Sequence, residues 1–279
     1  MIAILTKKEE LKMGRLIKNF TKYRYLLGEL VRKNIKLKYR RSYLGILWTM
    51  IEPLLTMIVL SVVFGVLLGR TGADPRVPFA VYVLTGRLLY SFFSSATNSA
   101  MKSIRSNSGM IKKVYVPKYM YPLSGIISNF VIFLISLIVL VAVILFYTMT
   151  GAYTVPISIS ILGAIIPLII LFFFSTGVGM MLSTMAVFFR DLEYLWSVLL
   201  MLIMYCSAIF YYASNMKGTA LQLIKFNPLF GVIENFRRCI FNQGMDWYLL
   251  GYTSAISVVV MVIGIFMFYK QQDKFILNI

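Results

Sequence analysis

The chain has 279 residues, of which 59% are hydrophobic and only 14% are charged, and its mean hydropathy is +0.82. Soluble domains carry about 25% charged residues, so this composition excludes an ordinary water-soluble globular protein, a disordered tail and a disulfide scaffold. The remaining charge is basic, with 28 Lys and Arg against 10 Asp and Glu. A membrane protein with a basic cytoplasmic face explains both features, whereas a nucleic-acid-binding protein would not be this apolar.

The sequence contains no histidine and only two cysteines, Cys206 and Cys239. The lack of histidine excludes a Ser-His-Asp triad, a Cys-His dyad and a zincin helix. No spacing typical of a metal site is present, and we expect no disulfide. We therefore expect neither catalytic residues nor a metal site in this chain.

The N-terminal region, residues 1–45, lacks the long apolar core of a cleaved signal peptide, so we expect it to stay in the cytoplasm. Apolar residues recur every four positions over 25–41 and form one stripe of a helix, with cations around the rest. This pattern predicts an amphipathic helix in the headgroup layer, which is either an anchor alone or also part of a partner-docking surface. The candidate contacts to lipid head groups are Arg32, Lys36, Lys38, Arg40 and Arg41.

Six segments are apolar over about the 20 residues that a helix needs to cross the membrane. The second is the most polar and contains Arg87, and the fourth is too long for one straight crossing. Pro167 and the glycines Gly177 and Gly179 are places where that fourth segment can kink or break. The predicted spans are 46–68, 79–100, 123–147, 157–189, 195–213 and 248–269.

The distribution of positive charge predicts the orientation of these spans. With six spans both termini lie on one side, and that side carries 21 of the 28 Lys and Arg, against six on the other. The positive-inside rule therefore places both termini in the cytoplasm. No internal repeat is visible, so an inverted-repeat carrier has no direct support.

Two connections between spans are unusual. Segment 101–122 has no acidic residue, and apolar residues recur at helical spacing within it, which predicts a short helix at about 107–121. It either serves only as positive-inside charge or seats in a groove on a cytoplasmic partner. Segment 214–247 is too short to cross and too apolar for a free loop, so we expect re-entrant half-helices broken near Asn227-Pro228 and Gly231, either packing over the bundle or forming a lid.

Three stretches resemble the ABC-2 family of export permeases, and more narrowly the permeases for O-antigen, capsular polysaccharide and wall teichoic acid. KLKYRRSYLGILWTMIEPLL, residues 36–55, resembles the start of that group, where a basic surface helix precedes a Tyr-Leu-Gly-x-Leu-Trp stretch and an apolar-Pro pair. MIKKVYVPKYMYP, residues 110–122, resembles the coupling helix, and NPLFGVIENFRR, residues 227–238, resembles the segment before the last span. The matching residues of the first stretch are Tyr43, Leu44, Gly45, Leu47, Trp48 and Pro53.

The resemblance implies an all-α integral membrane protein with the ABC-2 exporter fold, in which two copies form a pore in the plasma membrane above two separate ATPase chains. The chain has no G-x-x-x-x-G-K-[ST] phosphate loop, so ATP and Mg would be bound by the partner ATPase and this chain is not an enzyme by itself. Closure of the ATPases would push on the coupling helix, and the surface helix would carry the movement into spans one and five. The coupling residues are Met110, Ile111, Lys112, Lys113, Val114, Tyr115 and Pro117.

The function that we expect is export of a lipid-linked cell-envelope glycan. Aromatic side chains present both an apolar face and a polar group to sugars, so Trp48, Tyr205, Tyr211 and Tyr212 are pore-lining candidates, although Tyr211 and Tyr212 also fit an interfacial belt. Glu52 is a further pore candidate. It either pairs with Arg87 across the membrane interior or extends to the interface instead.

Three alternatives remain open from the sequence. An ABC-2 exporter of a small drug or lipid would have a shorter surface helix and fewer pore aromatics. A membrane glycan-modifying enzyme is disfavoured by the lack of histidine and of a paired-acid motif. A secondary carrier would need coupling acids in mid-membrane, where Glu52 is the one acidic candidate.

Overall fold

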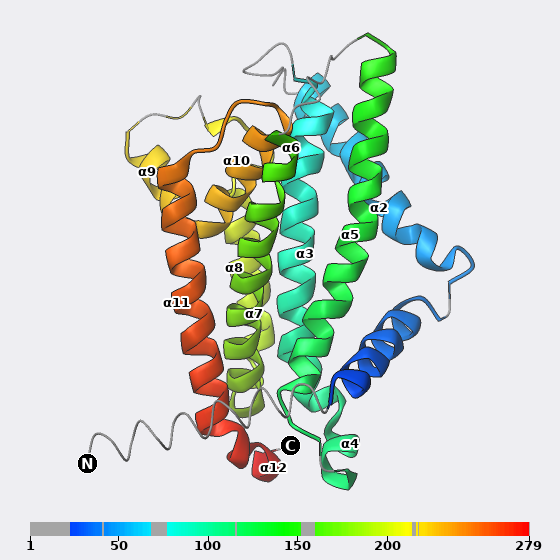
Figure 1. The fold of residues 1–279 in the computed structure, drawn as a ribbon, viewed down its shortest axis with the longest axis vertical. Coiled ribbons are helices and arrows are strands. Elements are labelled where there is room, and N and C mark those ends of the chain that lie inside the picture. Colours follow the sequence, from blue (N-terminus) through cyan, green and yellow to red (C-terminus); the bar gives the residue numbers. More distant parts are fainter. Residues whose placement is uncertain are drawn as a thin grey trace.

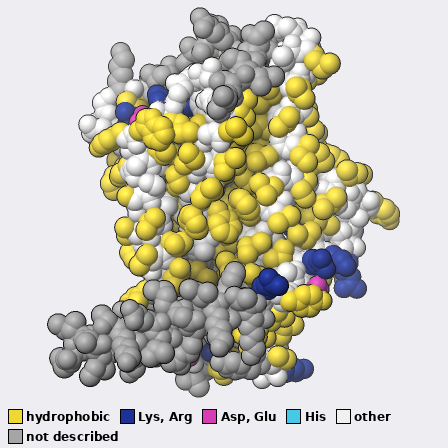
Figure 2. Space-filling model, viewed as in Figure 1, with side chains coloured by type: hydrophobic (Ala, Val, Ile, Leu, Met, Phe, Trp, Pro, Cys, Tyr) yellow, Lys and Arg dark blue, Asp and Glu magenta, His cyan; other side chains and the backbone are white. Residues whose placement is uncertain are grey.

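The computed structural model describes residues 23–40, 42–67, 77–114, 116–151, 160–213, 216 and 218–278. Within these ranges every regular element is a helix and no strand occurs, which confirms the all-α class. The long helices run side by side along one direction (Figure 1). A hydrophobic belt covers the middle of the molecule, and groups of Lys and Arg lie below it (Figure 2).

Four helical segments are long and apolar enough to cross a membrane by length and composition. The first combines η1 (Gly45–Leu47), α2 (Trp48–Leu60) and a π-helical stretch, η2 (Ser61–Leu67). The others are α5 (Met120–Met149), the pair α6 (Ser160–Gly163) and α7 (Ile165–Phe188), and α11 (Trp247–Gln271).

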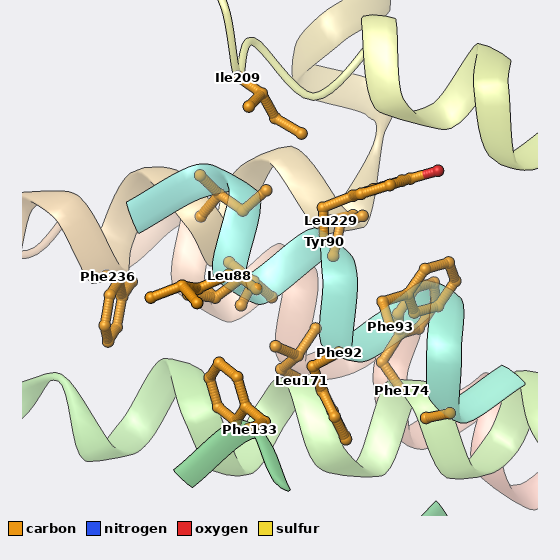
Figure 3. Close-up of a cluster of buried hydrophobic side chains, with 14 of the residues drawn as sticks. Leu88, Tyr90, Phe92, Phe93, Phe133, Leu171, Phe174, Ile209, Leu229 and Phe236 are labelled. Atoms are coloured by element: carbon orange, nitrogen blue, oxygen red, sulfur yellow. The ribbon is translucent and has the colours of Figure 1, made fainter. Parts of the chain in front are cut away.

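The helix α3 (Phe79–Ser106) occupies the centre of the bundle. It is six residues longer than the predicted span 79–100 and falls outside the four apolar segments because it carries Arg87 and many Ser and Thr residues. Its neighbours α2, α5 and α7 cover it, and its buried aromatic residues form the core with side chains of α5, α7 and α10 (Figure 3). A polar helix is thus kept from lipid by apolar neighbours.

The helix α8 (Leu192–Tyr205) is shorter than the predicted span 195–213. Its 14 residues span about 21 Å, which is less than the ~30 Å hydrocarbon core. Residues 206–213 form turns and bends with a single 3₁₀ position at Ala213, and Ala208 has a left-handed φ of 47°. The prediction of a helix through 213 is therefore wrong.

The fourth apolar segment breaks at Ala164, between α6 and α7, and not at the proline or glycines that we expected. Pro167 lies in the first turn of α7, where the missing N–H has no helical partner to lose. Gly177 remains helical, and its lack of a side chain allows close packing, because a Cβ there would lie 2.6 Å from the backbone nitrogen of Met261 on α11.

The segment before α11 forms two short helices, α9 (Thr219–Phe226) and α10 (Pro228–Ile240). They separate at Asn227-Pro228, and the Asn227 side chain accepts a hydrogen bond from the amide of Leu229 at 3.0 Å. Gly231 lies inside α10 and breaks nothing, because its missing side chain makes room for Thr253 and Leu249 of α11. The expected second break is thus wrong. Residues 214, 215 and 217 of the predicted 214–247 segment lie outside the described residues.

At the opposite end of the bundle lie the helix over 23–39, α4 (Ser108–Lys113), η4 (Gln272–Lys274) and α12 (Phe275–Asn278) (Figure 1). We call this the α4 end, and the other the α10 end. A second apolar cluster unites these elements through residues such as Leu27, Ile111 and Phe275. The surface helix, α4 and the last helix therefore share one core.

Candidate functional site

The helix α4 projects from the α4 end as a short foot. Ile111 is buried in the apolar cluster there, whereas Met110, Lys112, Lys113 and Val114 are exposed. The helix ends at Lys113, not near 121 as predicted, because the backbone of Val114 is extended. Pro117 further disfavours helical backbone at Val116, the residue before it. Pro117 lies in the turn that begins α5, and Tyr115 lies outside the described residues.

A salt-bridge cluster joins the base of α3, just before α4, to the start of α8. The carboxylate of Glu193 lies 3.1 Å from Arg105 and 3.4 Å from Lys102. Arg105 also donates to the backbone carbonyl of Ala186 near the end of α7. Three helices therefore meet at one ion cluster beside α4.

Polar contacts continue between α3 and α8 toward the α10 end. The indole nitrogen of Trp196 donates to Thr97 at 3.3 Å, and the hydroxyl of Tyr90 donates to the carbonyl of Leu200 at 2.9 Å. The outer face of α8 is exposed and apolar. The contacts recur about once per turn of α8, so this helix is attached to α3 along a polar stripe, with Glu193 at its first turn.

A cavity of about 310 Å³ lies between the surface helix, α2, α3 and α5. It brings together three charges that are far apart in sequence, Lys38, Glu52 and Arg87. The rest of its wall combines hydroxyl, amide and apolar side chains. These other lining residues are Tyr39, Thr49, Pro53, Thr56, Leu88, Ser91, Phe92, Ser95, Asn129, Ile132, Phe133 and Ser136.

Glu52 and Arg87 share this cavity but do not form an ion pair. None of the salt bridges among the described residues joins them, and Arg87 instead donates to the Met204 sulfur at 3.7 Å and lies 5.7 Å from the ring centre of Tyr90. Of the two alternatives for Glu52, direct pairing with Arg87 therefore does not occur in this structure. Desolvation lowers the pKa of Lys38, and the Glu52 carboxylate opposes that shift.

The predicted head-group contacts separate into different environments. Lys38 donates to the amide oxygen of Asn129 at 3.5 Å, and Arg32 pairs with Glu29 at 3.2 Å on the exposed side of the helix. Lys36, Lys38 and Arg40 are exposed, and Arg41 lies outside the described residues. Only Lys38 among them lines the cavity.

The aromatic candidates also lie in different places. Trp48 and Tyr205 are exposed at the start of α2 and the end of α8. Tyr212 instead packs against Tyr82 of α3, with 4.2 Å between ring centres, and the carbonyl of Tyr211 accepts from the Tyr82 hydroxyl at 3.1 Å. Tyr211 and Tyr212 therefore fit a structural contact with α3 as well as they fit a pore wall.

Sequence reasoning missed Arg237, which it counted as a charge in an outer loop. This side chain is 2% exposed and is the largest fully buried one in the described residues. Its guanidinium donates to the carbonyls of Ala208 and Tyr82, both at 3.0 Å, and to the hydroxyl of Thr85 at 3.3 Å. Arg237 thus ties α10 to α3 and to the residues after α8.

Helical spacing within the amphipathic α10 does separate Arg237 from its neighbour Arg238. Arg237 follows Ile233 by four residues and precedes Ile240 by three, which places it on the apolar face, whereas Arg238 follows Glu234 by four on the other face and lies 3.7 Å from it. The pairing of Glu193 with Arg105, by contrast, has no local signal, because 88 positions separate the two residues.

Residues 25–241 match the family model described as "ABC-2 type transporter". Similar proteins include an "O-antigen export system permease protein RfbA" of Klebsiella pneumoniae, 28% identical over 253 residues that cover 90% of this chain and 93% of the relative. Another protein of that name, from Myxococcus xanthus, is 27% identical over 94% of this chain and 98% of the relative. The "Polysialic acid transport protein KpsM" of Escherichia coli is 24% identical over 86% of this chain and 91% of its own.

Proposed function

Because this chain belongs to the ABC-2 type transporter family, we propose that it is the membrane-spanning permease subunit of an ATP-driven exporter of a lipid-linked cell-envelope glycan. The observation that carries this proposal is the near end-to-end similarity to permeases named for O-antigen export and polysialic acid transport. Teichoic acid, O-antigen and capsular polysaccharide all fit the glycan class. The polar, charged cavity among helices of membrane-crossing length supports a hydrophilic substrate over an apolar drug.

The ATPase in this proposal is a separate chain, and two copies of it bind ATP and Mg below a pore made by two copies of this chain. The α4 foot supports such an arrangement, because Met110 and Val114 offer exposed apolar contacts beside the exposed cations Lys112 and Lys113. Ile111 anchors the foot from inside, so pressure on α4 reaches the same apolar core as the surface helix.

The proposed topology has six spans in the plasma membrane, with both termini in the cytoplasm. To the four apolar segments it adds α3, which its neighbours shield from lipid, and α8 together with residues 206–213. The helices α9 and α10 then form the outer re-entrant segment. The surface helix and α12 both lie at the α4 end, which supports a common side for the two terminal regions (Figure 1).

Movement passes from α4 to α8 through α3 in this proposal. ATP stabilises one arrangement of the ATPases and so biases the position of α4. Since α3 leads into α4 and carries the Glu193 ion cluster and the polar stripe, α8 follows α3. Arg237 extends the connection to α10, so an event at the cytoplasmic face reaches the outer segment.

Deletion of the gene from its host tests the proposal. We expect loss of a surface glycan, accumulation of its lipid-linked form inside the cell, and restoration of both by the wild-type gene. Affinity purification of the tagged chain from native membranes is expected to recover an ATP-hydrolysing chain. An unchanged surface glycan together with a lost resistance to small apolar compounds would favour the drug-exporter alternative.

A further inference from the structure

The cavity between α2, α3 and α5 contains charged donors that lack a suitable acceptor. Arg87 has five N–H donors, yet its contacts within the described residues are a sulfur and an aromatic ring. A charge among membrane helices is costly unless it is paired, so Arg87 requires an anion or several oxygen acceptors. The lack of an ion pair to Glu52 leaves that requirement unmet.

The neutral groups in the wall do not meet this requirement, because most are engaged with the backbone. The hydroxyls of Thr49 and Thr56 donate to carbonyls of their own helical segment, each at 2.8 Å. Ser136 donates to the carbonyl of Thr49 at 3.0 Å, and the amide nitrogen of Asn129 donates to Gly125 at 2.8 Å. These contacts fix the wall but give Arg87 no acceptor.

Donors for a ligand line up on α3. Arg87, Ser91 and Ser95 follow one another at four-residue spacing, which places them on one helix face about 6 Å apart along the axis. The hydroxyls of Ser91 and Ser95 have no hydrogen-bond partner within the described residues. From the surface helix, Lys38 lines the same cavity and uses one of its three N–H groups on Asn129.

We propose that this cavity binds the anionic phosphate group of a membrane lipid, with Arg87 and Lys38 as cationic contacts and Ser91 and Ser95 as hydroxyl donors. Phosphate is anionic and rich in acceptors, which matches guanidinium, ammonium and hydroxyl groups. A neutral sugar hydroxyl would leave the charge of Arg87 uncompensated. The phosphate is carried either by a polyprenyl glycan carrier or by a phospholipid, and the carrier form rests on the function proposed above.

Glu52 acts in this site as a charge that limits retention. Its carboxylate lies in the cavity wall and influences Lys38, so it repels a phosphate that Lys38 attracts. A transporter needs a bound group to leave as well as enter. We therefore expect Glu52→Gln to increase lipid retention and slow release.

Lipid retention by the purified full-length chain tests the site. The chain is placed in nanodiscs of phosphatidylcholine containing either undecaprenyl phosphate or phosphatidylglycerol at equal amounts, and bound lipid is counted by native mass spectrometry. We expect wild-type protein to retain the anionic lipid in preference to zwitterionic phosphatidylcholine, whose phosphate is balanced by choline, and Arg87→Gln and Lys38→Gln each to reduce retention about tenfold. Preference for undecaprenyl phosphate identifies the carrier as the source, preference for phosphatidylglycerol identifies the phospholipid, and equal retention supports a site that binds the phosphate group that the two lipids share.

Lys33→Gln is the matched control, because Lys33 is an exposed cation on the same surface helix and does not line the cavity. It is expected to retain lipid as wild type does. Arg87→Lys keeps the charge, so a folded Arg87→Lys protein with partial retention separates loss of binding from loss of folding. Equal losses of bound lipid in Lys33→Gln and Arg87→Gln would overturn the proposed site. Full lipid retention in a folded Arg87→Gln protein would overturn it as well.

The outcomes for this site and for the proposed function are distinguishable. Retention that is insensitive to Arg87 and Lys38, combined with loss of surface glycan on deletion, removes the site and keeps the function. Specific retention combined with an unchanged surface glycan keeps the phosphate site and removes the glycan exporter.

Discussion

Glu193 and Arg105 form an ion pair of 3.1 Å across 88 positions of sequence, and they join the start of α8 to the helix that continues into α4. Lys102 contacts the same carboxylate at 3.4 Å. Both cations lie one or two turns before α4, where an ATPase would push. A single acidic side chain thus fixes α8 to the part of the chain nearest the proposed motor.

We expect Glu193→Ala to reduce glycan export about tenfold while the chain still reaches the membrane and associates with its ATPase. Without the carboxylate, movement of α4 and α3 reaches α8 only through the weaker hydrogen bonds that Trp196 and Tyr90 make nearer the α10 end. Export is measured by labelling of surface glycan, and ATP hydrolysis by the purified complex. Glu29→Gln is the control, because it removes the exposed pair with Arg32. Wild-type export by Glu193→Ala would contradict the proposed transmission.

The stability of the protein is predicted to depend on the close contact between Arg237 and Gly86. A Cβ at Gly86 would lie 2.5 Å from a guanidinium nitrogen of Arg237. Gly86→Ala therefore displaces a buried cation, and Arg237→Met removes one donor from each of the carbonyls of Tyr82 and Ala208. We expect each change to cost about 2–4 kcal/mol of unfolding free energy, seen as a lower melting temperature in nanodiscs.

The comparison for this pair is Arg238→Gln, because Arg238 is about one-third exposed and its nearest acid is 3.7 Å away. That change is expected to cost no more than about 1 kcal/mol. If Arg238→Gln lost as much unfolding free energy as Arg237→Met, the charge on α10, and not the buried contact, would determine stability.

The close approach of α7 and α11 predicts that alanine substitutions of two glycines have opposite effects on stability. A Cβ at Gly177 would lie 2.6 Å from the Met261 nitrogen and 2.7 Å from its Cα, both of which are backbone atoms. Gly177→Ala must therefore separate the helices, at a cost of about 1–3 kcal/mol. Gly251, on α11, has nothing near its would-be Cβ, so Gly251→Ala is expected to be neutral or to stabilise the protein by about 0.5–1 kcal/mol. Thermal unfolding of the two variants side by side measures the difference.

The lowered pKa of Lys38 predicts a pH-dependent stability. The folded pKa lies below the ordinary value of 10.5, so the unfolded chain holds more protons between these two values. Stability therefore rises with pH across that window through this group. Lys38→Gln is expected to flatten this part of the stability profile, measured by thermal unfolding at several alkaline pH values, whereas Lys33→Gln leaves it unchanged. An unchanged slope in Lys38→Gln would assign the effect to another group.

Hydrophobic runs and charge bias were enough to predict an all-α membrane protein with a surface helix and a broken segment before the last span. They were enough because lipid requires apolar helices and Asn227-Pro228 is a strong local start signal. The ends of α8 and α4 were not predictable in the same way. Residues 206–213 are apolar enough for a span, but contacts of Ala208 and Tyr211 with α3 hold them in turns.

The arrangement of the charged side chains in the candidate site could not be predicted from the sequence pattern. Helical rise from opposite membrane faces leaves a gap between Glu52 and Arg87 that two long side chains could nearly close, but it gives no information about which way each side chain turns within the cavity. Helical spacing places Arg237 on the apolar face of α10, but the groups that satisfy its charge are carbonyls contributed by α3 and by the residues after α8, which the sequence does not reveal. Tertiary contacts of this kind have no local code.

The polar central position of α3 has a consequence for biogenesis. An arginine at the middle of a helix opposes its release into lipid by about 2.5–3.5 kcal/mol, and the hydroxyl-rich face of α3 adds little to offset it. The helices that cover it, α5 and α7, are synthesised later, and the second of them ends at Phe188. In the proposed six-span topology, the nascent chain would therefore hold α3 at the translocon until roughly two-thirds of the protein has been made, and these helices would then enter the bilayer as one group.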